Sequence, residues 1–367
     1  MKNMNSRTPS SDADFLILAI NPGSTSTKIA VFRGETTLLV KNISHDASQL
    51  SRFVETTDQH EFRKQLILEE LAANHIPIRF HAVIGRGGLG KPISGGVYHI
   101  NDTLCNDMKH AQRKHACNLG CLIAAEIAET IPGCLALTAD PVVVDELIPE
   151  ARFSGLPDTP RRSIWHALNQ RAIARRYARE QGKRYEELNL IVCHLGGGVS
   201  IAAHRQGQAI DVNNALDGEG PFSPERAGTL PIGDLIRLCF SGRYQEAELL
   251  RMVTGRAGLE AHIGSKDVKE LVSRAEAGDE KVRLLIDAMT YQIAKSAAAQ
   301  AAVFKGKVDA ILLTGGMAHA PYITSRIADR IDWIAPVHTY PGEGEMEALG
   351  QNALGVLTGE LTAKCYT

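Results

Sequence analysis

The chain has 367 residues, of which 44% are hydrophobic and 22% charged, and its formal net charge is −2. Such a composition is that of a globular protein, with enough chain for two domains and a large core. The charge balance excludes a dedicated nucleic-acid binder, which would carry a basic excess.

Residues 1–14 are polar and lack the apolar stretch of a secretory signal, so we expect a flexible N-terminus. No run of about 18 uncharged apolar residues occurs, which argues against a membrane-spanning helix. The seven cysteines are scattered along the chain without paired spacing. An odd number of unpaired cysteines predicts a reduced, cytoplasmic protein.

The first structured stretch has an apolar run at 15–20, a turn of small polar residues, and a second apolar run at 29–32. This pattern predicts a strand, a tight turn and a second strand. The turn is Asn21-Pro22-Gly23-Ser24-Thr25-Ser26-Thr27-Lys28. Backbone N–H groups, hydroxyls and a lysine in such a turn suit a phosphate group. The alternative is a polar hairpin tip without a ligand.

Residues 60–74 have the apolar spacing of a helix. They are followed by a predicted short strand at 80–84 and by the segment Gly85-Arg86-Gly87-Gly88-Leu89-Gly90. This segment matches the dinucleotide pattern GxGxxG, but the Pro and Gly residues at 91–96 prevent the helix that such a site requires. Arg86 is more informative, because its guanidinium offers a fixed fork of donors in a glycine-rich loop. A surface arginine is the alternative.

Residues 101–130 are predicted to form one helix, followed by a strand at 134–139 that ends in Asp140. The helix carries histidines and cysteines at spacings that also occur in zinc sites, but no second ligand pair follows, which favours packing. Carboxylates at strand ends of α/β folds often face the ligand crevice. A helix cap or turn is the alternative for Asp140.

Residues 152–170 form a loop rich in Pro and Arg that leads into a helix ending near Gln181, and His166 lies near the start of this helix. The opening pattern then recurs: a strand at 188–193, the turn His194-Leu195-Gly196-Gly197-Gly198-Val199-Ser200, and an apolar return at 201–203. A unit repeated half a chain later suggests an internally duplicated two-domain fold.

The segment 211–234 is too rich in Gly, Pro and acidic residues for regular structure, and a long ordered loop is usually functional. It contains Arg226. After several helices, a buried strand at 308–314 ends in Gly315-Gly316, a pair that lets a flat ring lie against the backbone. A plain strand–helix turn is the alternative.

The last predicted helix opens at 341–347 and extends to about Thr362. Its first turn carries Glu343, Glu345 and Glu347, which suit the positive end of the helix dipole. These carboxylates can also hold a magnesium ion through water.

Several segments in a fixed order resemble the butyrate-type branch of the carboxylate kinase family, within the acetate and sugar kinase, Hsp70 and actin superfamily. They are INPGSTSTK, GRGG, DPVVVDEL, SGLP, RRSIWHALNQ, HLGGG, GPFSPERAGTLP, LTGGMA and YPGEGEMEAL. They extend from Asn21 to Leu349, nearly the whole chain.

The resemblance implies an α/β fold: a duplicated two-domain actin-like ATPase (ribonuclease H-like) architecture with a nucleotide cleft between the domains. It implies an N-terminal domain at 1–150, completed by a C-terminal helix at 350–367, and a nucleotide-binding domain at 151–349. A homo-oligomer, a dimer or larger, is also implied.

The resemblance further implies roles for single residues. The catalytic residues would be Arg86, Asp140, His166 and Arg226. ATP or ADP would be bound by Asn21, Ser24, Ser26, His194, Gly196, Gly197, Gly198, Gly315 and Gly316. Mg²⁺ would be bound near Glu345.

The implied reaction transfers a phosphoryl group from ATP to a short-chain carboxylate, butanoate or a branched acid, and gives an acyl phosphate and ADP. The alternatives are a kinase that prefers acetate or propionate, and an actin- or Hsp70-type ATPase without a carboxylate substrate. No nucleic acid or membrane partner is expected.

Three positions depart from the acetate-kinase pattern or stay open. Leu230 follows Gly-Thr where those relatives have a second catalytic arginine, so Arg226 is the candidate substitute. Gly197 stands where they have an asparagine. Lys28 stays without an assigned role.

Overall fold

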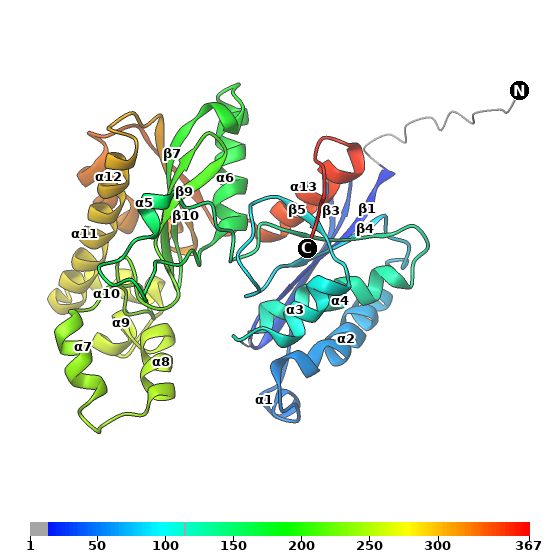
Figure 1. Cartoon of the computed structure of the whole chain (residues 1–367), viewed down its shortest axis with the longest axis horizontal. Coiled ribbons are helices and arrows are strands. Elements are labelled where there is room, and N and C mark those ends of the chain that lie inside the picture. The colour runs from blue at the N-terminus through cyan, green and yellow to red at the C-terminus, as the bar shows by residue number, and fades with distance from the viewer. Residues whose placement is uncertain (1–13, 114) are drawn as a thin grey trace, which may run out of the picture. The chain divides into compact units, whose positions relative to one another are not determined.

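Two β-sheets with helices on both faces organise the chain (Figure 1). The computed structural model describes residues 14–113 and 115–367, which divide into two compact units. Unit 1 holds the described residues up to Lys91 with Gly95–Val143 and Glu345–Thr367; unit 2 holds Pro92–Ser94 and Val144–Gly344. The expectation for 1–14 falls outside the described residues, except at Asp14.

The sheet of unit 1 has the strand order β12-β5-β6-β4-β1-β2-β3. Its strands are β1 (Leu16–Pro22), β2 (Ser26–Arg33), β3 (Thr36–Ser44), β4 (Ala82–Arg86), β5 (Val97–His99), β6 (Leu135–Ala139) and β12 (Lys364–Cys365). β1 forms an antiparallel hairpin with β2, as predicted, and pairs in parallel with β4, which pairs in parallel with β6.

The helices of unit 1 cover both faces of this sheet. They are α1 (Ala47–Leu50), η2 (Thr56–Gln59), α2 (His60–Ala73), α3 (Asp102–His110), η3 (Ala116–Asn118), α4 (Leu119–Glu129) and α13 (Glu345–Thr358). Leu18 and Ile20 of β1 pack with residues of α2 and α4 in one core. Asn21 points to the other face, where it contacts α13. Because side chains alternate along a strand, Asn21 lies on the face opposite the core that β1 forms with α2 and α4.

The sheet of unit 2 has the strand order β11-β10-β7-β8-β9. Its strands are β7 (Asn189–Leu195), β8 (Val199–Arg205), β9 (Gln208–Val212), β10 (Ala310–Gly315) and β11 (Val337–Pro341). β7, β10 and β11 are parallel, and β7-β8-β9 is an antiparallel meander. This repeats the order β6-β4-β1-β2-β3 of unit 1, so the predicted duplication is confirmed as a repeated topology.

Helices also cover both faces of the second sheet (Figure 1). They are α5 (Pro149–Arg152), α6 (Ala167–Glu180), η4 (Tyr185–Glu187), α7 (Ile232–Cys239), α8 (Glu246–Gly255), α9 (Gly258–Ile263), α10 (Val268–Glu276), α11 (Glu280–Val303), η5 (Gly316–His319) and α12 (Pro321–Ile331). α11 and α12 pack against one face of the sheet, and α6 packs against the other.

The prediction of one helix over 101–130 is wrong. α3 ends at His110, Ala111 has extended ψ, and the chain turns before α4 begins at Leu119. Asn118 is fully buried in the break, where its Oδ1 accepts from the Leu89 N–H at 2.8 Å. The break contains neither Gly nor Pro, so the apolar pattern of the sequence continues through it.

The predicted C-terminal helix is also wrong in its extent. α13 begins at Glu345, ends at Thr358, and is followed by Gly359 with φ +85°. A left-handed glycine stops a helix and turns the chain. The last residues then form β12, parallel to β5, where the Lys364 ammonium donates to the Gly95 carbonyl at 2.6 Å.

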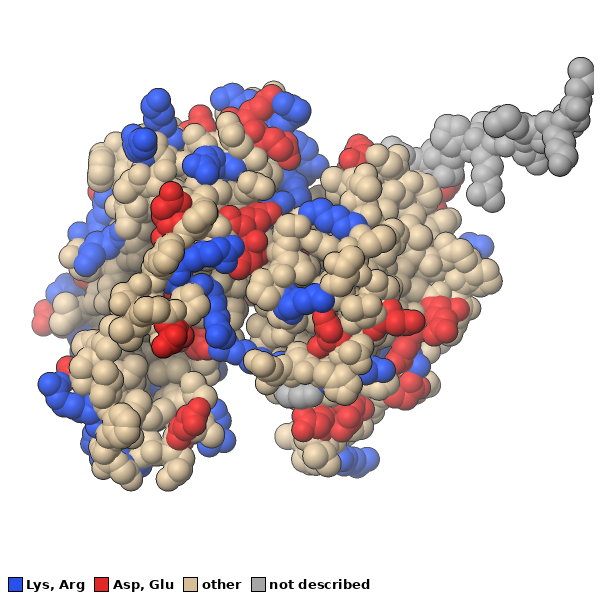
Figure 2. Space-filling model, in the orientation of Figure 1, with Lys and Arg blue, Asp and Glu red and all other residues tan. Residues whose placement is uncertain are grey.

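The chain passes from unit 1 to unit 2 between residues 143 and 144 and returns to unit 1 between 344 and 345. The expected boundaries were 150/151 and 349/350. The assignment of the two units as functional domains stays a prediction. Within the described residues, no helix has the length and apolarity that crossing a membrane requires. Figure 2 shows basic and acidic residues interspersed on the visible faces of both units, in keeping with a net charge of −2.

Candidate active site

Three parallel strands of unit 1 end at one edge of the sheet, and each end carries a predicted site residue. Ile20 pairs with Gly85, and Arg86 pairs with Ala139. Asn21, Arg86 and Asp140 therefore project from the carboxyl ends of β1, β4 and β6. In open α/β sheets this edge is where ligands bind.

Asn21, Arg86 and Glu345 form one hydrogen-bonded cluster at this edge. Glu345 Oε2 accepts from Asn21 Nδ2 at 2.7 Å and from Arg86 Nη1 at 2.8 Å. Arg86 Nη1 also lies 3.4 Å from Asn21 Oδ1. Glu345 is 6% exposed, so Arg86 supplies the positive charge that its burial requires.

The other nitrogens of Arg86, Nη2 and Nε, make no hydrogen bond to the described residues. The Arg86 side chain is 22% exposed, so solvent or a ligand can approach it. One nitrogen is thus fixed by the protein while two remain as donors. A guanidinium held in this way suits bidentate recognition of a carboxylate or phosphate.

Asp140 lies on the same edge but bonds to a different partner. Its Oδ1 accepts from the Gly96 N–H at 2.7 Å, and its own N–H donates to the Gly96 carbonyl at 3.0 Å. Its φ is +40°, which is strained for a residue with a side chain. The chain therefore maintains an unfavourable backbone conformation in order to place a buried carboxylate here.

A buried arginine, which the sequence pattern did not reveal, hydrogen-bonds to the first turn, residues 23–27. Arg63 of α2 is 1% exposed. Its Nη1 donates to the carbonyls of Gly23 at 2.7 Å and Ser26 at 3.1 Å, and its Nη2 donates to the carbonyl of Ser24 at 3.3 Å. Burial lowers the pKa of Arg63 to about 10, so the guanidinium stays charged at neutral pH. With the carbonyls directed at Arg63, the turn presents its other side to solvent.

The predicted phosphate-binding hydroxyls lie on this turn, where Ser24 is exposed and Ser26 half-buried. Lys28 pairs with Asn21 across the β1–β2 hairpin. Residues paired in this way project from the same face of a sheet, so Lys28 lies beside the cluster and is exposed.

In unit 2, two of the predicted histidines are stacked on one another. The rings of His166 and His194 have centroids 3.7 Å apart and planes inclined by 9°. His166 is the N-cap residue of α6, and His194 is near the end of β7. His194 Nδ1 lies 2.7 Å from Asn169 Oδ1, and His166 Nδ1 lies 2.9 Å from Ser200 Oγ.

The second glycine turn, residues 196–198, joins β7 to β8 and packs against Arg226. A side chain at Gly198 would overlap the guanidinium of Arg226. Arg226 Nη1 donates to the Ala215 carbonyl at 2.6 Å, and Nε is buried with no hydrogen-bond partner among the described residues. Burial lowers the pKa of Arg226. A half-buried cation therefore lies directly behind the predicted phosphate turn.

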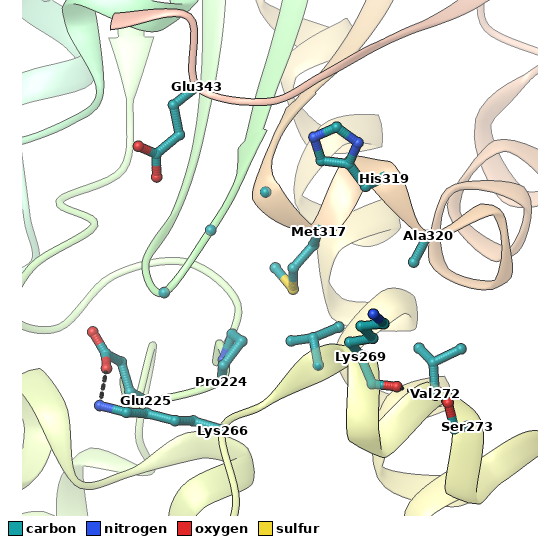
Figure 3. A pocket seen from close by; sticks show the side chains of 14 residues that line it. Pro224, Glu225, Lys266, Lys269, Val272, Ser273, Met317, His319, Ala320 and Glu343 are labelled. Carbon is teal, nitrogen blue, oxygen red and sulfur yellow. Dashed lines mark hydrogen bonds and ion pairs between the residues drawn. The ribbon is translucent and has the colours of Figure 1, made fainter. Parts of the chain in front are cut away.

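A cavity of about 640 Å³ opens beside this turn (Figure 3). Its polar lining residues are Glu225, Lys266, Lys269, Ser273, His319 and Glu343, and the others are Gly196, Gly197, Pro224, Val268, Val272, Gly316, Met317 and Ala320. Lys266 Nζ and Glu225 Oε2 lie 2.8 Å apart, as the dashed line in Figure 3 shows. The cavity combines an apolar wall with cations and glycine backbone.

The glycine pair after β10 has two different structural roles. Gly315 has φ +91°, and a side chain there would overlap the Leu195 carbonyl, so glycine is required by the fold. Gly316 lines the cavity and has open space where a side chain would be. The backbone at Gly316 is therefore open to the cavity, and binding of a flat ligand there stays a prediction.

Several lining residues of the cavity were not singled out from the sequence. Glu225 lies beside Arg226 in the loop that was predicted to be functional. Lys266 was not singled out because an isolated lysine carries no pattern, and Met317 appeared only within the segment LTGGMA, without a role of its own. Their position depends on α10 and η5, which are brought to the glycine turns only by the fold.

The chain is similar over nearly its whole length to proteins named as butyrate kinases. It is 61% identical over 350 residues to a probable butyrate kinase of Bacteroides thetaiotaomicron, covering 95% of this chain and 99% of the relative. It is 51% identical over 354 residues to butyrate kinase 2 of Clostridium acetobutylicum, covering 96% and 99%.

Solved structures show the same fold. Porphyromonas gingivalis acetate kinase superposes with a TM-score of 0.74 at 19% identity, covering 92% of this chain and 99% of that one. A propionate kinase from Francisella tularensis gives 0.71 at 18% identity, covering 92% and 98%. The predicted actin-like α/β fold is thereby confirmed. The acetokinase family model matches residues 159–332. The chain therefore belongs to the acetokinase family, phosphotransferases that take a carboxyl group as acceptor.

Proposed function

We propose that this protein transfers the γ-phosphoryl group of ATP to butanoate or a branched short-chain fatty acid, giving an acyl phosphate and ADP. The observation that carries the proposal is the state of Arg86. One of its nitrogens is fixed by Glu345 and Asn21, and two remain as donors at the ligand edge of the sheet. The relatives at 51–61% identity support butanoate as the acceptor.

The cavity of unit 2 supports the nucleotide part of the proposal. Met317, Val268 and Val272 offer an apolar surface for a base beside the open backbone of Gly316, and Lys266 and Lys269 offer charge for phosphates. In Figure 3 the Met317 side chain points into the cavity, towards α10. Its volume lies within the range typical of small-molecule sites.

The proposed mechanism is direct in-line transfer, in which positioning and charge neutralisation supply most of the catalysis. The substrate carboxylate is itself the nucleophile, so no strong base is needed. Arg86 binds and orients the acceptor. His166 and Arg226 stabilise charge on the transferring group, and the turns at 23–27 and 196–198 bind phosphate oxygens. Asp140, the fourth residue proposed to be catalytic, takes part through the magnesium ion.

Magnesium fits the donor set of unit 1. Glu345 Oε2 is occupied by Asn21 and Arg86, whereas Oε1 accepts no hydrogen bond from the described residues. Oε1, directly or through water, is the atom proposed to hold the ion, with Asp140 as the second carboxylate. Bound Mg²⁺ would supply neutralisation of the nucleotide phosphates.

An assay of acyl hydroxamate over a panel of carboxylates tests the proposal. We expect product only when a carboxylate is added, with the highest kcat/KM for butanoate or its branched relatives. A preference for acetate or propionate would overturn the acceptor assignment. ATP hydrolysis at the same rate without a carboxylate would instead favour the actin- or Hsp70-type ATPase.

We also propose a cytoplasmic homo-oligomer. The seven cysteines are all free, in keeping with a reducing compartment. Ile232, Ile236 and Phe240, on and just after α7, are 73%, 53% and 88% exposed, and apolar groups of this kind commonly mark a subunit contact. Light scattering of the purified chain is expected to give at least twice the monomer mass.

A further inference from the structure

A chain of buried hydrogen bonds extends through unit 2 and ends on His166. Tyr185 Oη lies 2.5 Å from His204 Nδ1, and His204 Nε2 lies 3.0 Å from Gln170 Oε1. Gln170 Nε2 lies 2.7 Å from Ser200 Oγ, which lies 2.9 Å from His166 Nδ1. His204, Gln170 and Ser200 are fully buried. None of these three was predicted to belong to the site.

A main-chain carbonyl fixes the direction of these hydrogen bonds. Gln170 Nε2 also lies 3.0 Å from the Ser200 carbonyl, a group that can only accept. The amide nitrogen must therefore face Ser200, and Oε1 must face His204. His204 Nε2 then donates to Oε1, and Nδ1 accepts from Tyr185. Burial, reinforced by two arginines of α6, lowers the pKa of His204 to about 3, so this ring is neutral at working pH.

The same logic continues at Ser200. Its Oγ accepts from Gln170 Nε2 and, at 3.4 Å, from the His166 main-chain N–H. Both partners are donors, so the hydroxyl hydrogen is directed to the third partner, His166 Nδ1. We propose that Ser200 and Gln170 are positioning residues that hold neutral His166 with its proton on Nε2.

This inference rests on the proposed function, in which His166 contacts the transferring phosphoryl group. A neutral ring with a proton on Nε2 donates to a phosphoryl oxygen, whereas the other tautomer would direct a lone pair at an anion. Stacking on His194 fixes the plane of the ring, and Asn169 fixes His194 in turn. Preorganised donors of this kind stabilise charge that develops in a transition state.

The primary test is nitrogen NMR of the full chain labelled with ¹⁵N-histidine, with the His166 signals assigned by their loss in H166N. We expect the wild-type ring to carry its proton on Nε2. Wild-type His166 protonated on Nδ1 would overturn the inference.

Ser200→Ala is expected to mix the two tautomers and to lower kcat roughly ten- to hundredfold, by analogy with the loss of the partner that orients a metal-ligating histidine. KM for ATP and butanoate should stay within about twofold of wild type, and Ser200→Thr, which restores the hydroxyl, should recover kcat. Ser163→Ala is the matched control, since Ser163 is a buried serine whose hydroxyl donates to the Val144 carbonyl at 2.6 Å. It should change neither kcat nor the His166 signals.

Gln170→Glu reverses the direction of the bonds. A carboxylate only accepts, so the Ser200 hydroxyl turns to it, and His166 is expected to carry its proton on Nδ1. Unchanged His166 signals and kcat in both Ser200→Ala and Gln170→Glu would overturn the inference. Should the wild type form no acyl phosphate, the proposed function fails while the spectra still decide the tautomer. An active kinase with His166 protonated on Nδ1 overturns only the inference.

Discussion

At the scale of single residues, Arg86 is the side chain on which the proposed chemistry depends most. Arg86→Ala is expected to lower kcat at least about a hundredfold, in line with the loss of a preorganised donor. Steady-state kinetics of the purified variant measure this, with Arg33→Ala, an exposed arginine of β2, as control. A kcat within a factor of two of wild type would contradict a role for Arg86 in the reaction.

Because Arg86 pairs with Glu345, variants of the two residues can separate the role of Arg86 in activity from its role in stability. Removing Arg86 alone leaves a buried carboxylate unpaired, which costs about 3–5 kcal/mol when such a pair is broken. The double variant Arg86→Gln, Glu345→Gln removes both charges and is expected to regain most of that stability without regaining activity. Denaturant titration and kinetics of the three proteins check this, and recovery of kcat in the double variant would refute it.

The glycine pair after β10 provides a matched test of the cavity. Gly316→Val places a side chain in open space, so the fold should persist while KM for ATP rises about tenfold or more. Gly315→Val meets the Leu195 carbonyl at φ +91°, so it should lower the melting temperature instead. An unchanged KM for ATP in folded Gly316→Val would remove Gly316 from the nucleotide site.

The sequence indicated the candidate site residues one by one but not the side chains that they contact. Motifs pointed to Asn21, Arg86 and Glu345 separately. That they form one cluster does not follow from the motifs, because Asn21 and Glu345 are 324 positions apart and Arg86 comes beside Asn21 only through the register of β1 with β4. Arg63 and Lys266 were missed because a single cation on a predicted helix or loop indicates solvent exposure. Only the fold shows that Arg63 is buried under the first turn.

At the scale of elements, Arg63 of α2 links this helix to the turn at 23–27, which is predicted to bind phosphate. Arg63→Met leaves the carbonyls of Gly23 and Ser24 without the guanidinium donor, at a cost of about 1–3 kcal/mol for each buried group left unpaired, while the Ser26 carbonyl keeps the Gly23 N–H at 2.7 Å. We expect a lower melting temperature and a raised KM for ATP, measured against Arg79→Met, an exposed arginine of the same unit. A variant with normal stability and normal KM would show that the turn holds its shape without Arg63.

Elements with strong periodicity or turn chemistry were predicted correctly, and those set by tertiary contacts were not. The hairpin of β1 and β2 has its Gly-Ser turn at the predicted place. The break between α3 and α4 depends on Asn118 bonding to Leu89, a contact 29 residues distant that no local pattern shows. β12 is likewise a strand only because β5 lies beside it.

At the scale of the whole molecule, each unit buries a histidine in its neutral form. Burial, with Arg63 nearby, lowers the pKa of His45 to about 4, and burial lowers that of His204 to about 3. The unfolded chain takes up protons near pH 6.5 while the folded chain does not. Stability is therefore full above about pH 6.5 and is lost as the pH falls towards 4 and 3.

Denaturant titrations at pH 7 and pH 5 check this dependence, because few carboxylates titrate in that interval. The free energy of unfolding is expected to be lower at pH 5, and His45→Gln should reduce the difference. A free energy that is equal at both pH values, or higher at pH 5, would contradict the neutral burial of these histidines.

The repeated sheet order gives each unit one glycine turn after its first strand, and this duplication is what the sequence revealed at long range. The two turns are proposed to serve transfer of a phosphoryl group to a carboxylate. Phosphorus NMR of ATP, butanoate and the protein tests it most directly. We predict that the γ-phosphate signal is converted into an acyl phosphate signal with equal formation of ADP, and only when butanoate is present. Release of inorganic phosphate at a rate indifferent to butanoate would contradict the account.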